Sequence, residues 1–296
     1  MPTAAARRAS VSLDAPDEVL EGATMAVRVS VEPPEGAGVL GGEVTLSRVI
    51  SYRYRRQDDD GGTRLAPVRR HDVVTAVPLP AAPGGPGPFV ADVLVPVPTP
   101  GPPSADAGLV AVDWSLRARV LLGSGGWTQA VRRVAVVTTA AEFGDVRDRP
   151  PHTDDRGHTV VAIDHLSSRR IAPGEHLTGD VVAAPLHAGP IRAVRLELLL
   201  CAHVPAGAAR PADAVGTKDA ATVVAGVELA AAIEVPEDLP LVRLPFELEV
   251  PAVLPGPSMV TPDFALEWTL RAVVSRPLHR DAYAEVALQG ATAVAG

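Results

Sequence analysis

The strongest constraint on this chain is a proline-rich motif that occurs twice, each time ahead of a tryptophan. Pro-Gly-Pro-Pro-Ser occupies 100–104 and Pro-Gly-Pro-Ser occupies 255–258. Trp114 and Trp268 each follow the final serine of their motif by ten residues, and each is followed by a similar Leu-Arg-Ala segment. Earlier segments match in the same order at an offset of about 150 residues, among them Leu13-Asp14 with Ile163-Asp164. Because ordered matches run through both halves, we infer two divergent copies of one folding unit.

The segments around the two tryptophans are predicted to be β-strands. Apolar residues alternate with polar ones, the period of a strand with one buried face. The residues expected to face inward are Val112, Trp114, Leu116, Ala118 and Val120 in the first copy and Phe264, Leu266, Trp268, Leu270 and Ala272 in the second. Trp114 and Trp268 are therefore predicted core anchors, whose indole N–H groups need a nearby acceptor.

Composition supports an all-β fold built from short strands. The 296 residues include 30 Pro and 26 Gly, which disfavour long helices, and 47% hydrophobic residues, which disfavour disorder. Turn signals at regular spacing indicate antiparallel sandwiches. We predict two tandem immunoglobulin-like β-sandwich domains at 1–142 and 158–296, joined by a linker at 143–157.

One segment has a local preference that conflicts with this prediction. Residues 218–233 are rich in alanine and would suit an amphipathic helix on propensity alone. The repeat matches them with residues 72–80, where Pro78 and Pro80 exclude a helix interior. We therefore predict a strand at 218–233.

No motif for catalysis, cofactors or metals occurs in the context that it requires. Residues 36–41 match GxGxxG by letter, but a strand pattern follows them where a dinucleotide site needs a helix. The chain has no Gly-Lys pair for a phosphate loop, and Ser124 lies in a Gly-Ser-Gly-Gly turn rather than a nucleophile elbow. The single cysteine, Cys201, is predicted to be a structural thiol and excludes a multi-thiolate zinc site. We expect no enzyme activity, no cofactor and no metal.

Histidines gather near the start of the second copy, but their spacing is not that of a metal site. None forms an HxH or HExxH motif, so solvated side chains are the favoured interpretation. The residues are His152, His158, His165, His176 and His187, with Asp154, Asp155 and Asp164 nearby.

Charge and hydropathy bear on location and partners. The formal net charge of −8 gives no general attraction to nucleic acid, and we expect no nucleic-acid partner. No run of about 18 apolar residues and no leader-like segment occur, so no integral membrane segment is expected and the predicted location is cytoplasmic.

An arginine cluster is the clearest candidate binding feature in this acidic chain. Arg53 and Arg55 alternate with Tyr52 and Tyr54 on a predicted strand, so the two arginine side chains lie on the same face. A guanidinium cluster of this kind would bind a phosphate or carboxylate in a bidentate manner. The alternative is a solvated hairpin whose arginines are balanced by Asp58, Asp59 and Asp60. The candidate anion-binding or partner-binding residues are Arg53, Arg55, Arg56, Arg69 and Arg70.

The order of motifs resembles that of the arrestin-like fold, in particular the bacterial sporulation-control arrestin-like proteins. The resemblance rests on Pro-Gly-Glu-His-Leu-Thr-Gly-Asp-Val-Val at 173–182, Val-Arg-Leu-Glu-Leu at 194–198 and the Pro-Gly-Pro-Ser to Trp segment at 255–274. It implies two seven-stranded β-sandwiches joined end to end by a short hinge, with no catalytic centre. It also implies an adaptor or scaffold that binds protein partners, in sporulation control or in cell-envelope and developmental processes.

Two further possibilities remain open at this stage. The first is a ligand-binding β-sandwich module, either a carbohydrate-binding or an anion-binding accessory protein. Sugar platforms need exposed aromatic rings, and Trp127 beside a Gly-rich turn is the one candidate tryptophan for that role. The second is a homodimer formed through free strand edges.

Overall fold

The computed structural model describes residues 9–57, 60–82, 85, 87–99, 101–139, 159–185, 189–205, 218–235 and 241–293. All regular structure in these residues is β-strand, which confirms the all-β prediction. The predicted linker at 143–157 lies outside the described residues.

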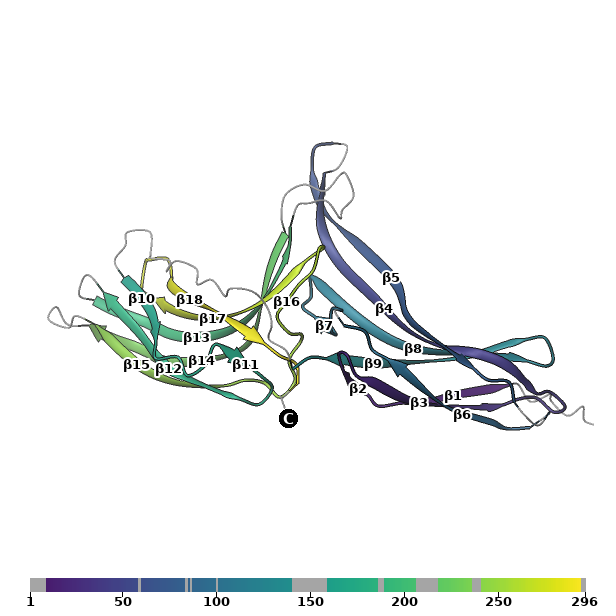
Figure 1. The fold of residues 1–296 in the computed structure, drawn as a ribbon. Helices are drawn as coiled ribbons and strands as arrows, with labels where there is room; N and C mark the ends of the chain where they lie inside the picture. Colours follow the sequence, from purple (N-terminus) through teal and green to yellow (C-terminus); the bar gives the residue numbers. More distant parts are fainter. Residues whose placement is uncertain are drawn as a thin grey trace, which may run out of the picture. The chain divides into compact units, whose positions relative to one another are not determined.

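In the described residues, the N-terminal sandwich contains nine strands in two sheets, rather than the seven that the resemblance implies (Figure 1). The strands are β1 (Ser10–Asp14), β2 (Glu18–Leu20), β3 (Thr24–Glu32), β4 (Val39–Gln57), β5 (Thr63–Leu79), β6 (Phe89–Pro96), β7 (Ala105–Asp106), β8 (Val110–Leu122) and β9 (Trp127–Val137). The small sheet has the order β1-β3-β6. The large sheet has the order β2-β9-β8-β4-β5, with β7 paired to β8.

The C-terminal sandwich repeats this plan strand for strand (Figure 1). Its strands are β10 (Thr159–Asp164), β11 (Arg170–Ile171), β12 (His176–Pro185), β13 (Gly189–Val204), β14 (Lys218–Val235), β15 (Val242–Glu249), β16 (Met259–Val260), β17 (Ala265–Ser275) and β18 (Ala282–Gly290). The small sheet is β10-β12-β15, and the large sheet is β11-β18-β17-β13-β14 with β16 paired to β17. Two tandem β-sandwiches are thus confirmed.

The strand register shows that the two copies correspond residue by residue. Leu13 pairs with Val29 across β1 and β3, and Ile163 pairs with Val181 across β10 and β12. The short strands β2 and β11 each run parallel to the last strand of their own copy. The predicted match of Leu13 with Ile163 therefore places both residues at the same point of the same sheet.

The compact units formed by the chain are not continuous in sequence. The N-terminal unit contains the residues up to Ser51, together with Val68–Ser104 and Ala111–Val137. The C-terminal unit contains Tyr52–Pro67, Ala105–Val110 and the residues from Thr138 onward. The far end of the β4–β5 hairpin therefore belongs to the C-terminal unit.

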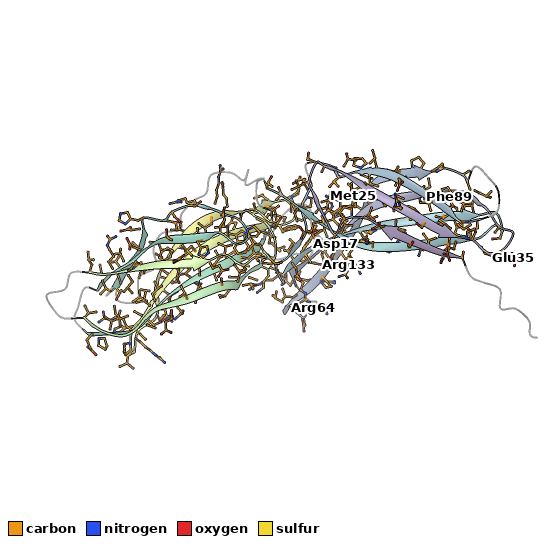
Figure 2. All side chains as sticks on the ribbon, turned by 90° about the horizontal axis from the view of Figure 1, so that it is seen from below. Asp17, Met25, Glu35, Arg64, Phe89 and Arg133 are labelled. Atoms are coloured by element: carbon orange, nitrogen blue, oxygen red, sulfur yellow. The ribbon has the colours of Figure 1, made fainter. Side chains whose placement is uncertain are left out.

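Each sandwich buries an apolar core between its two sheets. In the N-terminal unit Met25 on β3 and Phe89 on β6 are buried, and Figure 2 labels both side chains. The inward residues predicted on β8, from Val112 to Val120, are all buried. β17 differs from the half-buried strand that its sequence predicts, because Thr269 and Val273 on its other face are buried as well.

The repeated motif and its tryptophan form the same structure in both copies, which we call the Trp–Ser latch. In the C-terminal copy the Trp268 indole Nε1–H donates to the carbonyl of Gly256 at 3.0 Å. The Gly290 backbone N–H on β18 donates to Ser258 Oγ at 2.9 Å, and the Ser258 N–H donates to the Gly290 carbonyl at 2.9 Å. The latch therefore fastens the proline-rich segment to the core indole and to the last strand.

The N-terminal copy has the same set of hydrogen bonds. Trp114 Nε1–H donates to the Pro102 carbonyl at 3.1 Å, and the Val136 N–H on β9 donates to Ser104 Oγ at 2.9 Å. Both tryptophans are buried and have an acceptor for the indole N–H. The motif repeated in the sequence is thus a structural fastening between strands.

The alanine-rich segment forms β14, which confirms the predicted strand. Its backbone pairs with β13 along the whole strand: Val235 is opposite Gly189 at one end, and Lys218 is opposite Val204 at the other. The ladder has irregularities at Val194/Arg195 and Leu198/Leu199. Pairing with a long neighbouring strand satisfies the backbone N–H and C=O groups and outweighs the helical preference of alanine.

Candidate functional site

The predicted arginine cluster lies on the β4–β5 hairpin and is divided between the two compact units. Arg53, Arg55 and Arg56 belong to the C-terminal unit, whereas Arg69 and Arg70 belong to the N-terminal unit. The structure therefore does not gather all five residues in one unit. Asp58 and Asp59 lie outside the described residues, so their balancing role stays a prediction.

Within the C-terminal unit, the hairpin has one buried face and one exposed face. Tyr52 and Tyr54 are 4% and 6% exposed, while Arg53 and Arg55 between and after them are exposed. The rings of Tyr52 and Phe264 lie 6.5 Å apart, and the Arg53 N–H donates to the Leu109 carbonyl at 3.1 Å. The tyrosines anchor the hairpin, which leaves the two arginines in solvent.

Within the N-terminal unit, two hairpin arginines, Arg48 and Arg70, are engaged by an acidic neighbour, whereas Arg69 is exposed. Arg48 Nη2 lies 3.1 Å from Asp72 Oδ2, and Arg70 Nε lies 3.4 Å from the same oxygen. The Arg48 guanidinium also lies over the Trp114 ring at 5.5 Å from the centroid. Arg70 is thus tied to the acidic side chain that stabilises Arg48 above the latch tryptophan.

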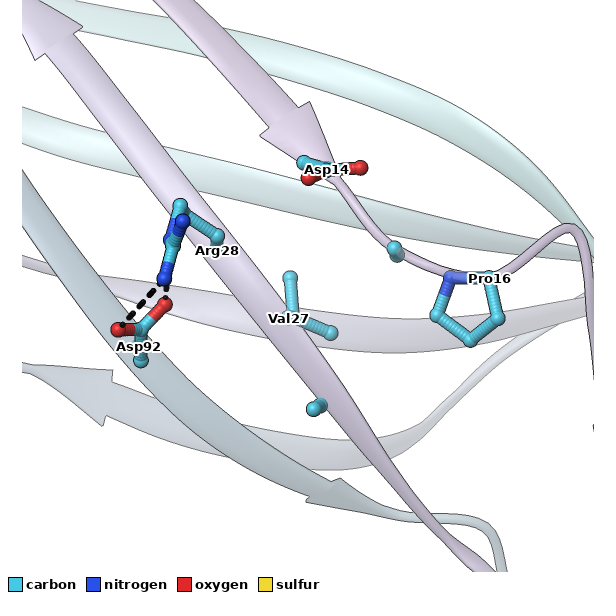
Figure 3. Close-up of a pocket in the computed structure, with 7 residues that line it drawn as sticks. Asp14, Pro16, Val27, Arg28 and Asp92 are labelled. Atoms are coloured by element: carbon cyan, nitrogen blue, oxygen red, sulfur yellow. Dashed lines mark hydrogen bonds and ion pairs between the residues drawn. The ribbon is translucent and has the colours of Figure 1, made fainter.

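The small sheet of the N-terminal unit carries a cavity of about 370 Å³ beside a paired arginine (Figure 3). Arg28 Nε lies 2.8 Å from Asp92 Oδ1, and Asp14 also lines the cavity. The hydrogen bond from Arg28 lowers the pKa of Asp92 below its usual value, and the hydrogen bond to Asp92 raises the pKa of Arg28. Two carboxylates surround one arginine, so this cavity has no surplus positive charge to hold an anion.

The same place in the C-terminal unit carries a different polar cluster. The strand register makes Asp164 the counterpart of Asp14 and Asp180 the counterpart of Arg28. His165 Nδ1 lies 2.9 Å and Arg243 Nη1 lies 2.8 Å from Asp180 Oδ2. The hydrogen bond from His165 lowers the pKa of Asp180, and the hydrogen bond from Arg243 lowers it too, with a smaller effect. His165 is therefore a hydrogen-bond partner of Asp180 in this cluster.

The other candidate histidines do not assemble a metal site in the described residues. His176 Nδ1 lies 3.0 Å from Glu247 Oε1, an exposed cross-strand pair. No group of three or more metal-ligating side chains occurs in the part of the chain that the structure describes. His152, His158 and His187 lie outside the described residues.

Cys201 lies on the outward face of β13, beside a cavity of about 550 Å³. The His203 ring is hydrogen-bonded to Asp219 at this cavity, and Glu267 also lines it. Cys201 Sγ contacts Thr269 Oγ1 at 3.9 Å. A thiol in contact with a neighbouring hydroxyl is consistent with the structural role expected for this cysteine.

A charge network covers the outward face of the large sheet in the C-terminal unit. Glu197 Oε2 accepts hydrogen bonds from Arg271 at 2.6 and 2.9 Å, and Glu197 Oε1 accepts one from Arg195 at 2.9 Å. Arg195 also lies 2.9 Å from Asp281. Burial raises the pKa of Glu197. The hydrogen bonds from Arg271 and Arg195 together lower this pKa by more than burial raises it, so the net shift is downward. Arg195 and Arg271 on this face are thus paired with carboxylates of the same unit.

The corresponding face of the N-terminal unit carries arginines with no such partners. Arg117 and Arg119 on β8 and Arg133 on β9 are exposed. The Arg119 guanidinium lies 4.3 Å from the centroid of the Trp127 ring, which is 52% exposed. The alternation of inward residues around Trp114 already predicts that Arg117 and Arg119 face outward, and the Gly-rich turn predicts that Trp127 is exposed. The sequence alone does not bring these residues together, because the pairing of β8 with β9 is a tertiary feature.

In the described residues, no helix is long and apolar enough to cross a membrane. Comparison of the chain with protein-family models and with curated proteins gave no match.

Proposed function

We propose that this chain is a non-enzymatic, cytoplasmic adaptor or scaffold of the arrestin-like type, which binds protein partners. The observation that carries the proposal is the duplicated nine-strand sandwich, in which both copies conserve the latch and the strand order while their outward faces differ in charge. A repeated scaffold with divergent surfaces is suited to holding two different partners. The resemblance in motif order places the expected setting in sporulation control or in cell-envelope and developmental processes.

The polar clusters on the described surface also favour binding over catalysis. Asp180 and Glu197 lie in ion pairs with arginines, and the pKa of each is below its ordinary value, which makes each a weak base. Asp72 is likewise held in ion pairs with Arg48 and Arg70. A general base or nucleophile needs an adjacent group that activates it. We therefore assign these clusters structural roles.

The test is capture of partners by the full chain. The tagged protein is used as bait in cells that encode it, and each captured protein is purified and returned to the purified chain in a direct binding measurement. We expect at least one partner to bind directly and saturably. The proposal is overturned if no captured protein rebinds while a small molecule binds specifically.

A ligand-binding module is the second candidate function, because Trp127 is exposed on a sheet face. One face of its indole is covered by the Arg119 guanidinium, which leaves less of the ring for stacking a sugar. Titration of Trp127 fluorescence with mono- and oligosaccharides tests this candidate. Saturable quenching that is lost in Trp127→Ala supports it, and an unchanged spectrum rejects it.

Self-association is a further form of the adaptor proposal. β5 and β14 lie at the ends of the two large sheets in the strand order. Edge strands of this kind pair with a second chain when nothing protects them. A homodimer predicts a concentration-dependent mass of twice the monomer in light scattering, and a constant monomer mass contradicts it.

A further inference from the structure

The outward faces of β8–β9 and β17–β18 can be compared position by position. Arg117 follows Trp114 by three residues and pairs with Val131, whereas Arg271 follows Trp268 by three residues and pairs with Glu285. At the next pair along, Ser115 is opposite Arg133, whereas Thr269 is opposite Ala287. The two copies therefore place the same arginine in opposite electrostatic surroundings.

In the C-terminal copy, the shared arginine is neutralised by its own sheet. Arg271 donates two hydrogen bonds to Glu197 and lies 3.9 Å from Glu285, which is largely buried. These carboxylates use the donors that a partner would otherwise bind. This face therefore offers no free guanidinium at Arg271.

In the N-terminal copy, the arginines remain available. Arg117 and Arg133 are exposed and form no ion pair or side-chain hydrogen bond with another described residue. The Arg119 guanidinium lies over the Trp127 ring, and Arg119 forms no ion pair or side-chain hydrogen bond with another described residue, so its N–H groups remain available to a partner. One acidic residue, Asp113, shares the outward phase of β8. The face has surplus positive charge on a chain whose net charge is −8.

The spacing on this face matches an extended acidic segment. Arg117 and Arg119 lie two residues apart on one strand, which is about 7 Å. Carboxylates at alternate positions of an extended peptide have the same repeat, and each fits a guanidinium in a bidentate manner. Arg133 lies diagonally across from Arg117, on the neighbouring strand. Val131 and Trp127, both exposed, supply apolar contact beside the charges.

We propose that the outward face of β8–β9, formed by Arg117, Arg119, Arg133, Val131 and Trp127, binds an extended acidic segment of a protein partner. This proposal rests on the adaptor function and names the chemistry of one partner. A protein segment is favoured over a nucleic acid because a long polyanion would be repelled by the net negative charge of the rest of the chain. The face also carries only one aromatic side chain for base stacking.

The experiment uses the full chain and a short labelled peptide with Glu at every second position and Thr between. Fluorescence anisotropy should show saturable binding that weakens as salt is raised. The matched peptide with Gln in place of Glu should bind at least about tenfold more weakly. Absence of binding to the Glu peptide at low salt overturns the proposal.

The variants separate this face from the charge of the whole protein. Arg117→Glu with Arg133→Glu should weaken peptide binding at least about tenfold. The control, Arg170→Glu with Arg192→Glu, alters two exposed arginines of the C-terminal unit and changes the net charge equally, so it should bind within about twofold of the natural chain. Equal loss in both variants overturns the proposal, and a thermal melt shows that each variant is folded.

Arg117→Lys with Arg133→Lys keeps the charge and removes the bidentate fork, and it should bind with intermediate affinity. A single-stranded oligonucleotide or a phosphatidylserine vesicle that binds this face as tightly as the Glu peptide overturns the choice of a protein segment. If the Arg117/Arg133 variant retains every captured partner, this surface fails while the adaptor function stands. If no partner is captured by either form, the adaptor function fails first.

Discussion

The hydroxyl oxygens of Ser104 and Ser258 each accept a hydrogen bond from a backbone N–H of a strand, although the sequence around the two serines has diverged. Ser258 Oγ also donates to the Leu288 carbonyl at 3.4 Å, and both latch segments lie beside a buried indole. The repeated motif therefore reflects a hydrogen-bonding requirement at the edge of the core. Loss of a hydroxyl would leave a buried backbone N–H without an acceptor, which is costlier than the loss of an exposed bond.

Ser258→Ala is expected to destabilise the protein by about 1–3 kcal/mol, because the Gly290 N–H loses its acceptor in a buried site. Urea unfolding measures this change in the free energy of unfolding. Ser12→Ala, on an exposed position of β1, is the matched control and should change stability by less than about 0.5 kcal/mol. Equal stability of the two variants would contradict the role of the latch.

Gly290→Ala is expected to disrupt the same latch by overpacking. A Cβ at this position would lie 2.2 Å from Trp268 Cδ1 and 2.3 Å from Nε1, so the indole must move. We expect a loss of about 1–3 kcal/mol and a shifted tryptophan emission spectrum. Gly126→Ala has open space around its Cβ and should leave both measurements unchanged. An unshifted spectrum in Gly290→Ala would show that the indole is not held as described.

At the scale of single elements, the neighbouring strands determine the secondary structure and the charge pairing that the local sequence does not specify. β14 has the composition of a helix, yet it extends along the full length of β13. The outward face of the same sheet carries Glu197 with two arginines, Arg195 from its own strand and Arg271 from β17. Both features depend on which strands lie side by side, which a single segment of sequence does not specify.

The Glu197 network predicts a pH dependence of stability. The folded state holds the pKa of Glu197 below its ordinary value of 4.5, so the carboxylate contributes its full stability above pH 4.5 and loses it as the pH falls through the lower folded value. Glu197→Gln should cost about 1–3 kcal/mol at pH 7 and flatten the acid side of the stability curve.

Urea unfolding at several pH values below 7 measures this slope. Glu249→Gln, at an exposed position of β15, removes a carboxylate of the same type outside the network. It should retain the slope of the natural chain. The interpretation of the network is wrong if Glu197→Gln and Glu249→Gln have the same acid slope.

At the scale of the whole molecule, the two compact units share the chain in an interleaved way. The residues of the hairpin end, Tyr52–Pro67, belong to the C-terminal unit although they lie within the first copy of the repeat. Tyr52 reaches the ring of Phe264 at 6.5 Å between centroids. The first copy therefore supplies an aromatic side chain to the unit built by the second.

A double-mutant cycle on Tyr52→Leu and Phe264→Leu tests this sharing. We expect a coupling energy of about 0.5–1.5 kcal/mol, because the tilted ring contact exists only when both aromatics are present. Unfolding followed by urea gives the four free energies that the cycle needs. The pair Tyr52→Leu and Phe89→Leu, which involves no ring contact with Tyr52 in the described residues, should show no coupling. Additive effects in the first cycle would show that the contact between Tyr52 and Phe264 contributes nothing to stability, which would contradict the sharing of Tyr52.

The amino-acid sequence by itself determined the strand content, the duplication and the burial of the two latch tryptophans, Trp114 and Trp268. These features follow from the alternation of apolar residues and from the repeated motif around Trp114 and Trp268, which are local or internally redundant signals. The tertiary structure alone decided which charged side chains meet. Arg117 and Arg271 have the same neighbours in sequence, yet one is solvated and the other is held by Glu197 from another strand. Charge pairing depends on contacts between strands that are distant in sequence, and for this reason the basic face of β8–β9 became visible only in the folded chain.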